Sequence, residues 1–213
     1  MVHYLSDPEK INTQVWERIR ELAVLDRFSS EEKQLVLHLI RECGDPSLAE
    51  RIHFSPNAIE AGKNALKNYA YILYDYETVR CGLDQALLTQ EPMSFVNKAL
   101  VISLAKANKQ TRAMASISQW KKYSKGCIAL FGKSGSALCQ LLELLRAREM
   151  ESPALVIATN AGFVNAEACK QALIEGFDEL KVEFIAIEGT YGGVSLASTA
   201  MNALLMLQRE TYV

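Results

Sequence analysis

Three glycine-rich turns in the second half of the chain are of a kind that can hold anions. They lie at Gly132, at Gly162 and at the pair Gly192 and Gly193, and each follows a short apolar run and leads into a stretch of small residues. Glycine lets the backbone approach a ligand, and the free N–H groups at a helix start favour negative charge. The turns, with Ser136 just after the first, therefore predict a platform for anionic groups.

Two charged side chains are expected near these turns. Arg112 follows Thr111 in the first turn of a predicted helix, where the helix dipole favours acidic rather than basic residues. It could reach solvent or an acidic neighbour, but the small residues around it leave room for a large ligand. Asp75 ends a β-prone run and could contact that ligand or cap a turn.

Other known site types fit poorly. Gly132-Lys133-Ser134 looks like the end of a nucleotide-binding P-loop, but position 128, where that motif needs glycine, is Ile128. The glycines of 189–193 do not have the spacing of a dinucleotide-binding turn. No G-x-S-x-G nucleophile motif occurs. No metal site is predicted, because metal-ligand spacing is missing around the histidines, which are His3, His38 and His53.

Helices and strands alternate through most of the chain. Asp7-Pro8 and the capping box from Ser29 to Glu32 begin two helices, the second ending near Gly44. Further helices are expected over 58–67, 77–88, 95–106 and 111–122, and strands over 71–74, 127–131, 154–158 and 183–187. This alternation predicts one α/β domain over residues 1–213, with three layers and a mostly parallel sheet flanked by helices.

The composition excludes several classes of partner. The chain has 213 residues, and 25 acidic against 23 basic residues give a net charge of −2 with no basic stripe, so no nucleic acid is expected. No apolar run is long enough for a membrane span, and residues 1–6 lack the features of a signal peptide. The five cysteines form no C-x-x-C pair, which predicts reduced thiols in a cytoplasmic protein.

Taken in order, these segments resemble the precorrin-8X methylmutase family of cobalamin biosynthesis. No single segment is specific, but their order and spacing are. The matching segments are Asp7–Ile11, Cys43–Asp45, Phe54–Pro56 with Ala58, Glu60–Gly62, Asp75 with Thr78–Gly82, Thr111–Arg112, Gly132 with Ser136–Leu138, Gly162–Val164, and Gly192–Gly193 with Asn202–Leu204.

The resemblance implies a reaction and a substrate. The family moves a methyl group from C-11 to C-12 of a corrin precursor, precorrin-8 or its cobalt form, giving hydrogenobyrinate or cobyrinate without a cofactor. Its members are homodimers. The tetrapyrrole carries many carboxylates, which suits glycine turns and an arginine. The expected substrate-binding residues are Asp45, Asp75, Thr111, Arg112, Gly132, Ser136, Gly162, Gly192 and Gly193.

The chain departs from the family pattern at the expected catalytic position. The family's histidine stands in an Ile-His-Thr-Thr-Gly-Asp-like stretch, and here Arg41 takes its place. Arginine stays protonated, so it can donate a fixed hydrogen bond but cannot give up its proton. His38 lies one turn earlier on the same helix face. Arg41 and His38 are therefore the predicted catalytic pair, with a surface histidine as the alternative.

Two further departures alter the polar groups of the implied site. Val15 replaces a serine usually near the substrate, and Thr190 and Tyr191 replace basic residues usually before the paired glycines. A non-catalytic corrinoid carrier or regulator is therefore the rival interpretation. A nucleotide-dependent transferase built on residues 132–134 is a second rival.

Overall fold

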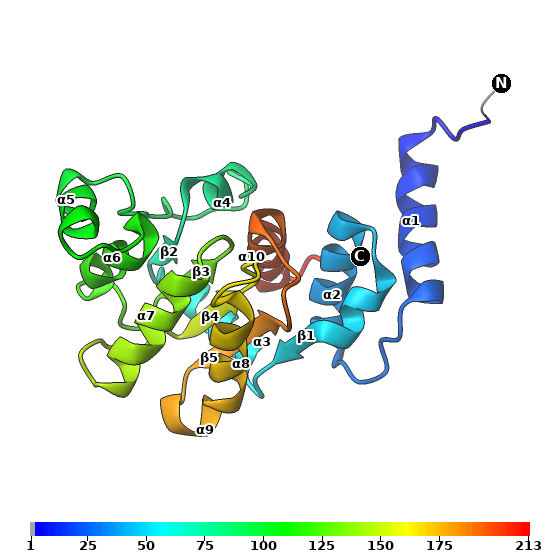
Figure 1. Ribbon diagram of the computed structural model, residues 1–213. Helices are drawn as coiled ribbons and strands as arrows, with labels where there is room; N and C mark the ends of the chain where they lie inside the picture. The colour runs from blue at the N-terminus through cyan, green and yellow to red at the C-terminus, as the bar shows by residue number, and fades with distance from the viewer. Residues whose placement is uncertain (1–2) are drawn as a thin grey trace.

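The computed structural model, which describes residues 3–213, contains a five-stranded, mostly parallel sheet (Figure 1). The strand order is β1-β5-β4-β3-β2; β2 to β5 are parallel and β1 pairs antiparallel with β5. This confirms the predicted fold class, although the short edge strand β1 was not predicted. The strands are β1 (Ile52–Phe54), β2 (Ile72–Tyr74), β3 (Ile128–Phe131), β4 (Leu155–Ala158) and β5 (Glu183–Ile187).

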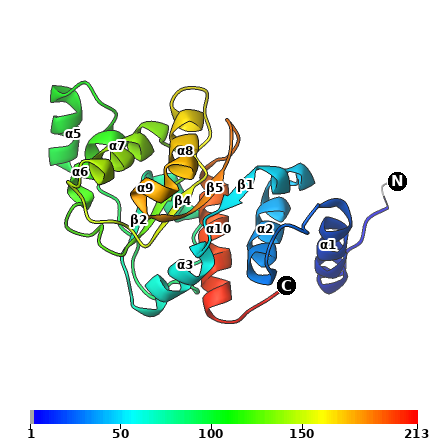
Figure 2. The same cartoon turned by 90° about the horizontal axis from the view of Figure 1, so that it is seen from below.

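Helices cover both faces of the sheet, so the fold has three layers (Figure 2). One face packs against α2, α3 and α10, and the other against α6, α7, α8 and α9, as two separate apolar clusters. The helices are α1 (Pro8–Leu22), α2 (Ser30–Cys43), the 3₁₀ helix η1 (Pro46–Arg51), α3 (Ala58–Lys67), α4 (Glu77–Cys81), α5 (Ala99–Ala107), α6 (Arg112–Trp120), α7 (Gly135–Arg146), α8 (Ala166–Glu175), α9 (Phe177–Leu180) and α10 (Val194–Gln208).

The first two helices begin where the sequence predicts, and the second also ends there. The Asp7 carboxylate accepts the first free N–H groups of α1, and the capping box from Ser29 to Glu32 begins α2. Gly44 ends α2 with φ of 69°, a left-handed conformation that glycine adopts without steric cost. Helix α1 lies at one end of the molecule beside α2 (Figure 1).

Three predicted helices are shorter in the structure, among them the helix expected over 111–122, which runs from Arg112 to Trp120. The helix expected over 77–88 ends at Cys81, because Asn202 of α10 donates a hydrogen bond to the Gly82 carbonyl and accepts one from the Asp84 N–H. Those bonds use the backbone groups that a longer helix would need. The helix expected over 95–106 begins only at Ala99.

The prediction that all cysteines are reduced is wrong for one pair. Cys139 of α7 and Cys169 of α8 form a disulfide, with their Cα atoms 5.3 Å apart. The residues are 30 positions apart in sequence and meet only because α7 and α8 pack side by side. Cys43, Cys81 and Cys127 are free thiols.

Within residues 3–213, no helix combines the length and apolarity needed to cross a bilayer. Met1 and Val2, which belong to the segment predicted to lack signal-peptide features, lie outside the described residues.

Candidate functional site

The loops that carry the predicted site residues meet at one edge of the sheet. Strands β2 to β5 run in the same direction, so their carboxyl ends share this edge, where α/β sheets commonly bind ligands. Strand β1 runs the other way, so η1, which precedes it, reaches the same edge. The edge therefore runs from α2 and η1 at one end to α5 and α6 at the other (Figure 1).

The loop after β3 already holds an anion of the chain's own. The Asp75 carboxylate accepts hydrogen bonds from the backbone N–H groups of Gly132, Lys133 and Ser134, at 3.1, 2.9 and 2.5 Å. Asp75 is fully buried, and burial raises the pKa of this carboxyl to about 6, against the opposing effect of the three hydrogen bonds. The structure thus favours the capping interpretation of Asp75 and gives these N–H groups an internal partner.

Gly132 also packs closely against α10 and α4. A Cβ atom at this position would lie 2.9 Å from the Val194 Cα atom and 2.9 Å from Val79 Cγ2. Glycine is needed here so that the loop can approach α10. The resemblance of residues 132–134 to a P-loop therefore has a structural explanation without a nucleotide.

The loops after β4 and β5 are hydrogen-bonded to each other. The Gly162 N–H donates to the Thr190 carbonyl at 3.1 Å, and the Gly193 N–H donates to the Thr159 carbonyl at 2.5 Å. The Thr159 hydroxyl in turn donates to the Gly193 carbonyl at 3.0 Å. We call these two loops, residues 159–165 and 188–193, the glycine platform.

Only glycine fits the centre of this platform. Gly192 has φ of 141°, and a Cβ atom there would collide with the Thr159 carbonyl oxygen. Gly193 has φ of 144° with no heavy atom near the position of a Cβ. The two glycines therefore let the loops join and leave the start of α10 uncovered by a side chain at position 193.

Two buried polar side chains lie in or against the platform. Lys170 of α8 is fully buried, and its ammonium group donates to the Tyr191 carbonyl at 2.8 Å. Burial lowers the pKa of Lys170 to about 8, although Glu167 favours the charged form. Asn160 is also fully buried, and within the described residues neither its side-chain oxygen nor its nitrogen has a hydrogen-bond partner.

Arg112 and Thr111 lie together at the β2 end of the edge. The Thr111 hydroxyl caps α6 and lies 3.2 Å from the Ser136 hydroxyl, which places both near the loop after β3. Arg112 donates to the Asn97 side-chain oxygen at 3.1 Å and is exposed. Asn97 also approaches Glu77, so this end carries a small polar network around an accessible guanidinium.

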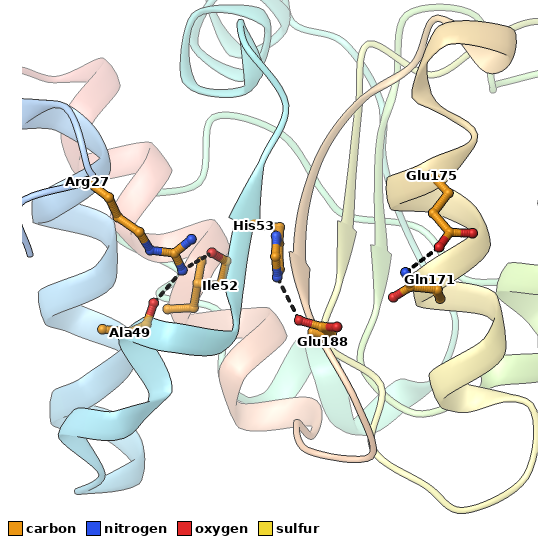
Figure 3. A network of polar contacts seen from close by, with 7 residues as sticks. All are labelled: Arg27, Ala49, Ile52, His53, Gln171, Glu175 and Glu188. Carbon is orange, nitrogen blue, oxygen red and sulfur yellow. Dashed lines mark hydrogen bonds and ion pairs between the residues drawn. The ribbon is translucent and has the colours of Figure 1, made fainter. Parts of the chain in front are cut away.

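The β1 side supports the platform from the other direction (Figure 3). The His53 ring of β1 lies 2.9 Å from the carboxylate of Glu188, the first platform residue after β5. Arg27, in the loop between α1 and α2, donates to the carbonyls of Ala49 and Ile52 at 2.6 and 2.7 Å. These contacts hold η1, β1 and the platform in register; the third pair in Figure 3, Gln171 with Glu175, lies within α8.

The end of α2 touches the platform directly. The Tyr191 hydroxyl lies near the thiol of Cys43, whose hydrogen bonds go to the carbonyls of Ile40 and Asp45, and burial raises the pKa of both groups. Asp45 caps η1, accepting from the Ser47 N–H at 2.9 Å and the Ser47 hydroxyl at 2.7 Å. Asp45 therefore lies at the predicted edge, with one carboxylate oxygen engaged locally.

The predicted catalytic pair packs on one tryptophan. The Arg41 guanidinium lies 4.5 Å from the ring centroid of Trp16, and the His38 ring meets the same indole edge-on at 5.1 Å. Burial, and then the positive charge of Arg41, lower the pKa of His38 below its usual value of 6.5. His38 is therefore mainly a neutral imidazole at pH 7.

Arg41 also lines a groove of about 780 Å³ between α1 and α2. Its lining is mostly apolar and includes Val15, one of the positions where the chain departs from the family pattern. The groove lies between α1 and α2, whereas Arg112 begins α6, and these helices lie at opposite ends of the edge (Figure 1). Four strand spacings of about 4.8 Å separate the outer strands β1 and β2. One chain therefore does not bring Arg41 and Arg112 together.

Sequence reasoning missed several of these groups. Lys170 lies on the buried face of α8, which also carries Ala166, Cys169 and Leu173. A charged residue at a position of this apolar stripe was the sequence signal that could have identified it. Trp16 and Asn97 gave no such local signal. Among residues 3–213 no cluster of three or more His, Cys, Asp or Glu side chains could hold a metal ion.

Comparisons with known proteins point to one family. The sequence model of the family described as precorrin-8X methylmutase matches residues 10–207. The chain is 31% identical to the precorrin-8X methylmutase of Pseudomonas aeruginosa, over 96% of this chain and 98% of that protein. It is 29% identical to the cobalt-precorrin-8 methylmutase of Priestia megaterium, over 94% of this chain and 88% of that protein.

Solved structures agree with these sequence matches. A crystal structure of precorrin-8X methylmutase from Thermus thermophilus superimposes with a TM-score of 0.83 at 30% identity, covering 95% of this chain and 97% of that one. A structure described as a precorrin-8X methylmutase related protein has a TM-score of 0.78 at 22% identity, which bears on the fold alone.

Proposed function

The chain belongs to the precorrin-8X methylmutase family, and from that premise we propose that it is an isomerase of cobalamin biosynthesis. The reaction moves a methyl group from C-11 to C-12 of precorrin-8, or of cobalt-precorrin-8, to give hydrogenobyrinate or cobyrinate. Atoms are neither added nor removed in this rearrangement. The protein must therefore hold one conformer of the ring and stabilise the charge that develops during migration.

The glycine platform is the observation that carries this proposal. Its two loops are joined through Gly162 and Gly193, and the second loop ends at the start of α10, a helix of 15 residues. A peripheral carboxylate of the ring binds at this helix start, where free N–H groups favour negative charge. Arg112 holds a second carboxylate, with Thr111 and Ser136 beside it.

Arg41 and His38 are proposed to act on the ring itself. The guanidinium of Arg41, held over Trp16, offers a permanent positive charge and hydrogen-bond donors toward the groove between α1 and α2. His38 is mainly neutral at pH 7, so its imidazole can accept a proton that the ring releases and later return it. Loss of either group should lower kcat more than it raises KM.

A homodimer is part of the proposal. Helix α1 lies at one end of the molecule, and the groove beside it is open and mostly apolar. Because Arg41 and Arg112 lie at opposite ends of the edge, a second copy that places its α1–α2 end against the α5–α6 end would bring both arginines to one ring. The substrate would then contact both chains.

One observation favours the rival function of a non-catalytic corrinoid binder. Arginine occupies the position at which a histidine is implied by the family resemblance, and His38 is packed against Trp16. A protein with an intact platform and no titrating group at the ring would bind a corrinoid without changing it. The two functions share the platform and differ only in chemistry.

An absorbance time course with precorrin-8, metal-free and with cobalt, separates these functions. Conversion to the spectrum of the methyl-migrated product supports the methylmutase, and a bound but unchanged spectrum supports the carrier. In the variants Arg41→Met and His38→Gln, the affinity for product should change less than about threefold, which is under about 0.7 kcal/mol. Their turnover should fall at least tenfold. Lys122→Met, at an exposed position just after α6, is the control.

A further inference from the structure

Lys170 is a buried charge that the proposed chemistry does not yet use. It lies on α8 with no exposed surface, and its ammonium donates to the Tyr191 carbonyl at 2.8 Å. An ammonium group has three N–H donors. Among the described residues the Tyr191 carbonyl is the one hydrogen-bond acceptor that it reaches, and no carboxylate lies within ion-pair distance.

Such a group is costly to keep in the fold. Taking an ammonium out of water is unfavourable unless an anion or several acceptors replace the water. Glu167, one turn earlier in α8, is exposed and only partly offsets this cost. A leucine or methionine would fill the same stripe of α8, next to Cys169 and Leu173, without the penalty.

The position of Lys170 explains what the charge can do. Its single acceptor is the carbonyl of Tyr191, which immediately precedes Gly192 and Gly193. The same loop joins the loop after β4 through Thr159 and Gly162. Lys170 therefore connects α8 to the centre of the glycine platform, whose own residues include no lysine or arginine.

A second buried group in the platform also lacks partners. Asn160 follows directly after Thr159 at the end of β4 and has no exposed surface. Its side-chain oxygen and nitrogen have no hydrogen-bond partner among the described residues. Buried amides without partners are rare because an unsatisfied buried polar group is costly to the fold. The platform is thus polar inside and incompletely satisfied, as expected of a site that a polar ligand or water completes.

We propose that Lys170 is a positioning residue of the platform: it holds the Tyr191–Gly193 backbone in its ligand-binding conformation and supplies the positive charge that draws a substrate carboxylate there. This inference rests on the proposed function for the identity of the ligand but not for the loop contact. The carboxylate binds the N–H groups at the start of α10, with the ammonium behind them. Lys170 touches the loop and not the reacting atoms.

Two substitutions separate the contact from the charge. Lys170→Met keeps the apolar stem and removes both, whereas Lys170→Gln keeps a donor for the Tyr191 carbonyl without the charge. Amide hydrogen exchange reports the contact: Gly162 and Gly193 should exchange at least tenfold faster in Lys170→Met and be partly protected again in Lys170→Gln. Unchanged exchange in both folded variants overturns the positioning role.

Binding of hydrogenobyrinate and of its neutral methyl ester reports the charge. The wild-type protein should prefer the acid, and both variants should lose about tenfold in affinity for the acid and little for the ester. Lys122→Met should keep the wild-type preference. With precorrin-8, KM should rise and kcat should change less than about twofold, a split that a general loss of packing would not give.

The outcomes of the two arms are distinguishable. If the variants fold and keep the acid preference, the electrostatic role is overturned while the proposed function stands. If wild-type protein binds neither the acid nor the ester, the proposed function and the electrostatic role are overturned together, and hydrogen exchange still decides the loop contact. A large loss of thermal stability in both variants would make Lys170 a structural residue and overturn the proposal.

Discussion

The loop after β3 and the loops after β4 and β5 look alike in sequence but differ in what the fold does with them. All are glycine turns between a strand and a helix. The buried charge at the loop after β3 is negative, because the Asp75 carboxylate accepts hydrogen bonds from the backbone N–H groups of Gly132 to Ser134. The buried charge at the loops after β4 and β5 is positive, because the Lys170 ammonium donates a hydrogen bond to the Tyr191 carbonyl.

This difference decides which turn can hold an anion. A nest of N–H groups that is occupied by an internal carboxylate offers little to a second one and repels it. The β5 turn has its carbonyl groups tied to Lys170 and Thr159, and the start of α10 is left without a capping side chain. We therefore propose that the substrate carboxylate binds at the glycine platform and not at residues 132–134.

Removing the Asp75 carboxylate should cause the largest loss of stability, and it tests the role of the negative charge at the loop after β3. Asp75→Ala leaves three buried or half-buried N–H groups without an acceptor, so we expect a loss of about 4 kcal/mol in the free energy of unfolding. Urea denaturation measures it. The exposed Asp178→Ala variant should change stability by less than about 0.5 kcal/mol. An Asp75 variant as stable as wild type would show that the carboxylate is not needed there.

Adding one methyl group to the platform should have the next largest effect. Gly192→Ala brings a Cβ atom into the Thr159 carbonyl, so we expect about 3 kcal/mol of destabilisation and loss of product binding. Gly126 has a φ of 67° with open space around it. Gly126→Ala should therefore cost only about 1 kcal/mol, from backbone strain alone. Equal costs in thermal denaturation would show that the close approach is unimportant.

Removing Arg112 should weaken binding without weakening the fold. The side chain is exposed and makes one hydrogen bond to Asn97, whereas a carboxylate would accept a charge-assisted bond worth about 2 kcal/mol. Arg112→Ala should thus lower product affinity about thirtyfold with an unchanged melting temperature. Arg146→Ala, which removes a surface arginine of α7 paired with Glu179, is the control. Unchanged affinity in Arg112→Ala would remove this residue from the site.

The pH dependence of ligand affinity at the platform should be the smallest effect, and it tests the Lys170 charge most directly. The pKa of Lys170 is lowered to about 8, so the ammonium is lost as pH rises through 8. Affinity for hydrogenobyrinate should fall about tenfold between pH 7 and 9.5 in wild type, and stay flat in Lys170→Met. Binding titrations at several pH values measure this, and a parallel fall in the variant would contradict it.

Stability should move in the opposite direction over the same range. The folded pKa of Lys170 lies below the ordinary value of 10.5, so between pH 8 and 10.5 the unfolded chain binds more protons than the folded one. The contribution of Lys170 to folding stability therefore rises with pH there. Denaturation curves at pH 7.5 and 10 should show this rise in wild type relative to Lys170→Met.

Much of the local structure could be predicted because its causes are local. The limits of α3 and β5 follow the sequence signals to the residue, and the caps at Asp7 and Ser29 bond to neighbours three positions away or fewer. The repeated strand–glycine–helix pattern likewise determined the parallel sheet and the edge at which function was expected. These features depend on propensity, capping and apolar spacing, all of which can be read within about ten residues.

The remaining features depend on partners far apart in sequence. Asp75 accepts hydrogen bonds from residues 57 to 59 positions later, and Lys170 donates to Tyr191, 21 positions later. Asn202 bonds to the Gly82 carbonyl, 120 positions earlier, just after the end of α4. The sequence by itself determined which turns could bind an anion. Only the tertiary structure decided which turn a buried carboxylate already occupies, because the energy of a buried charge depends on what packing places around it.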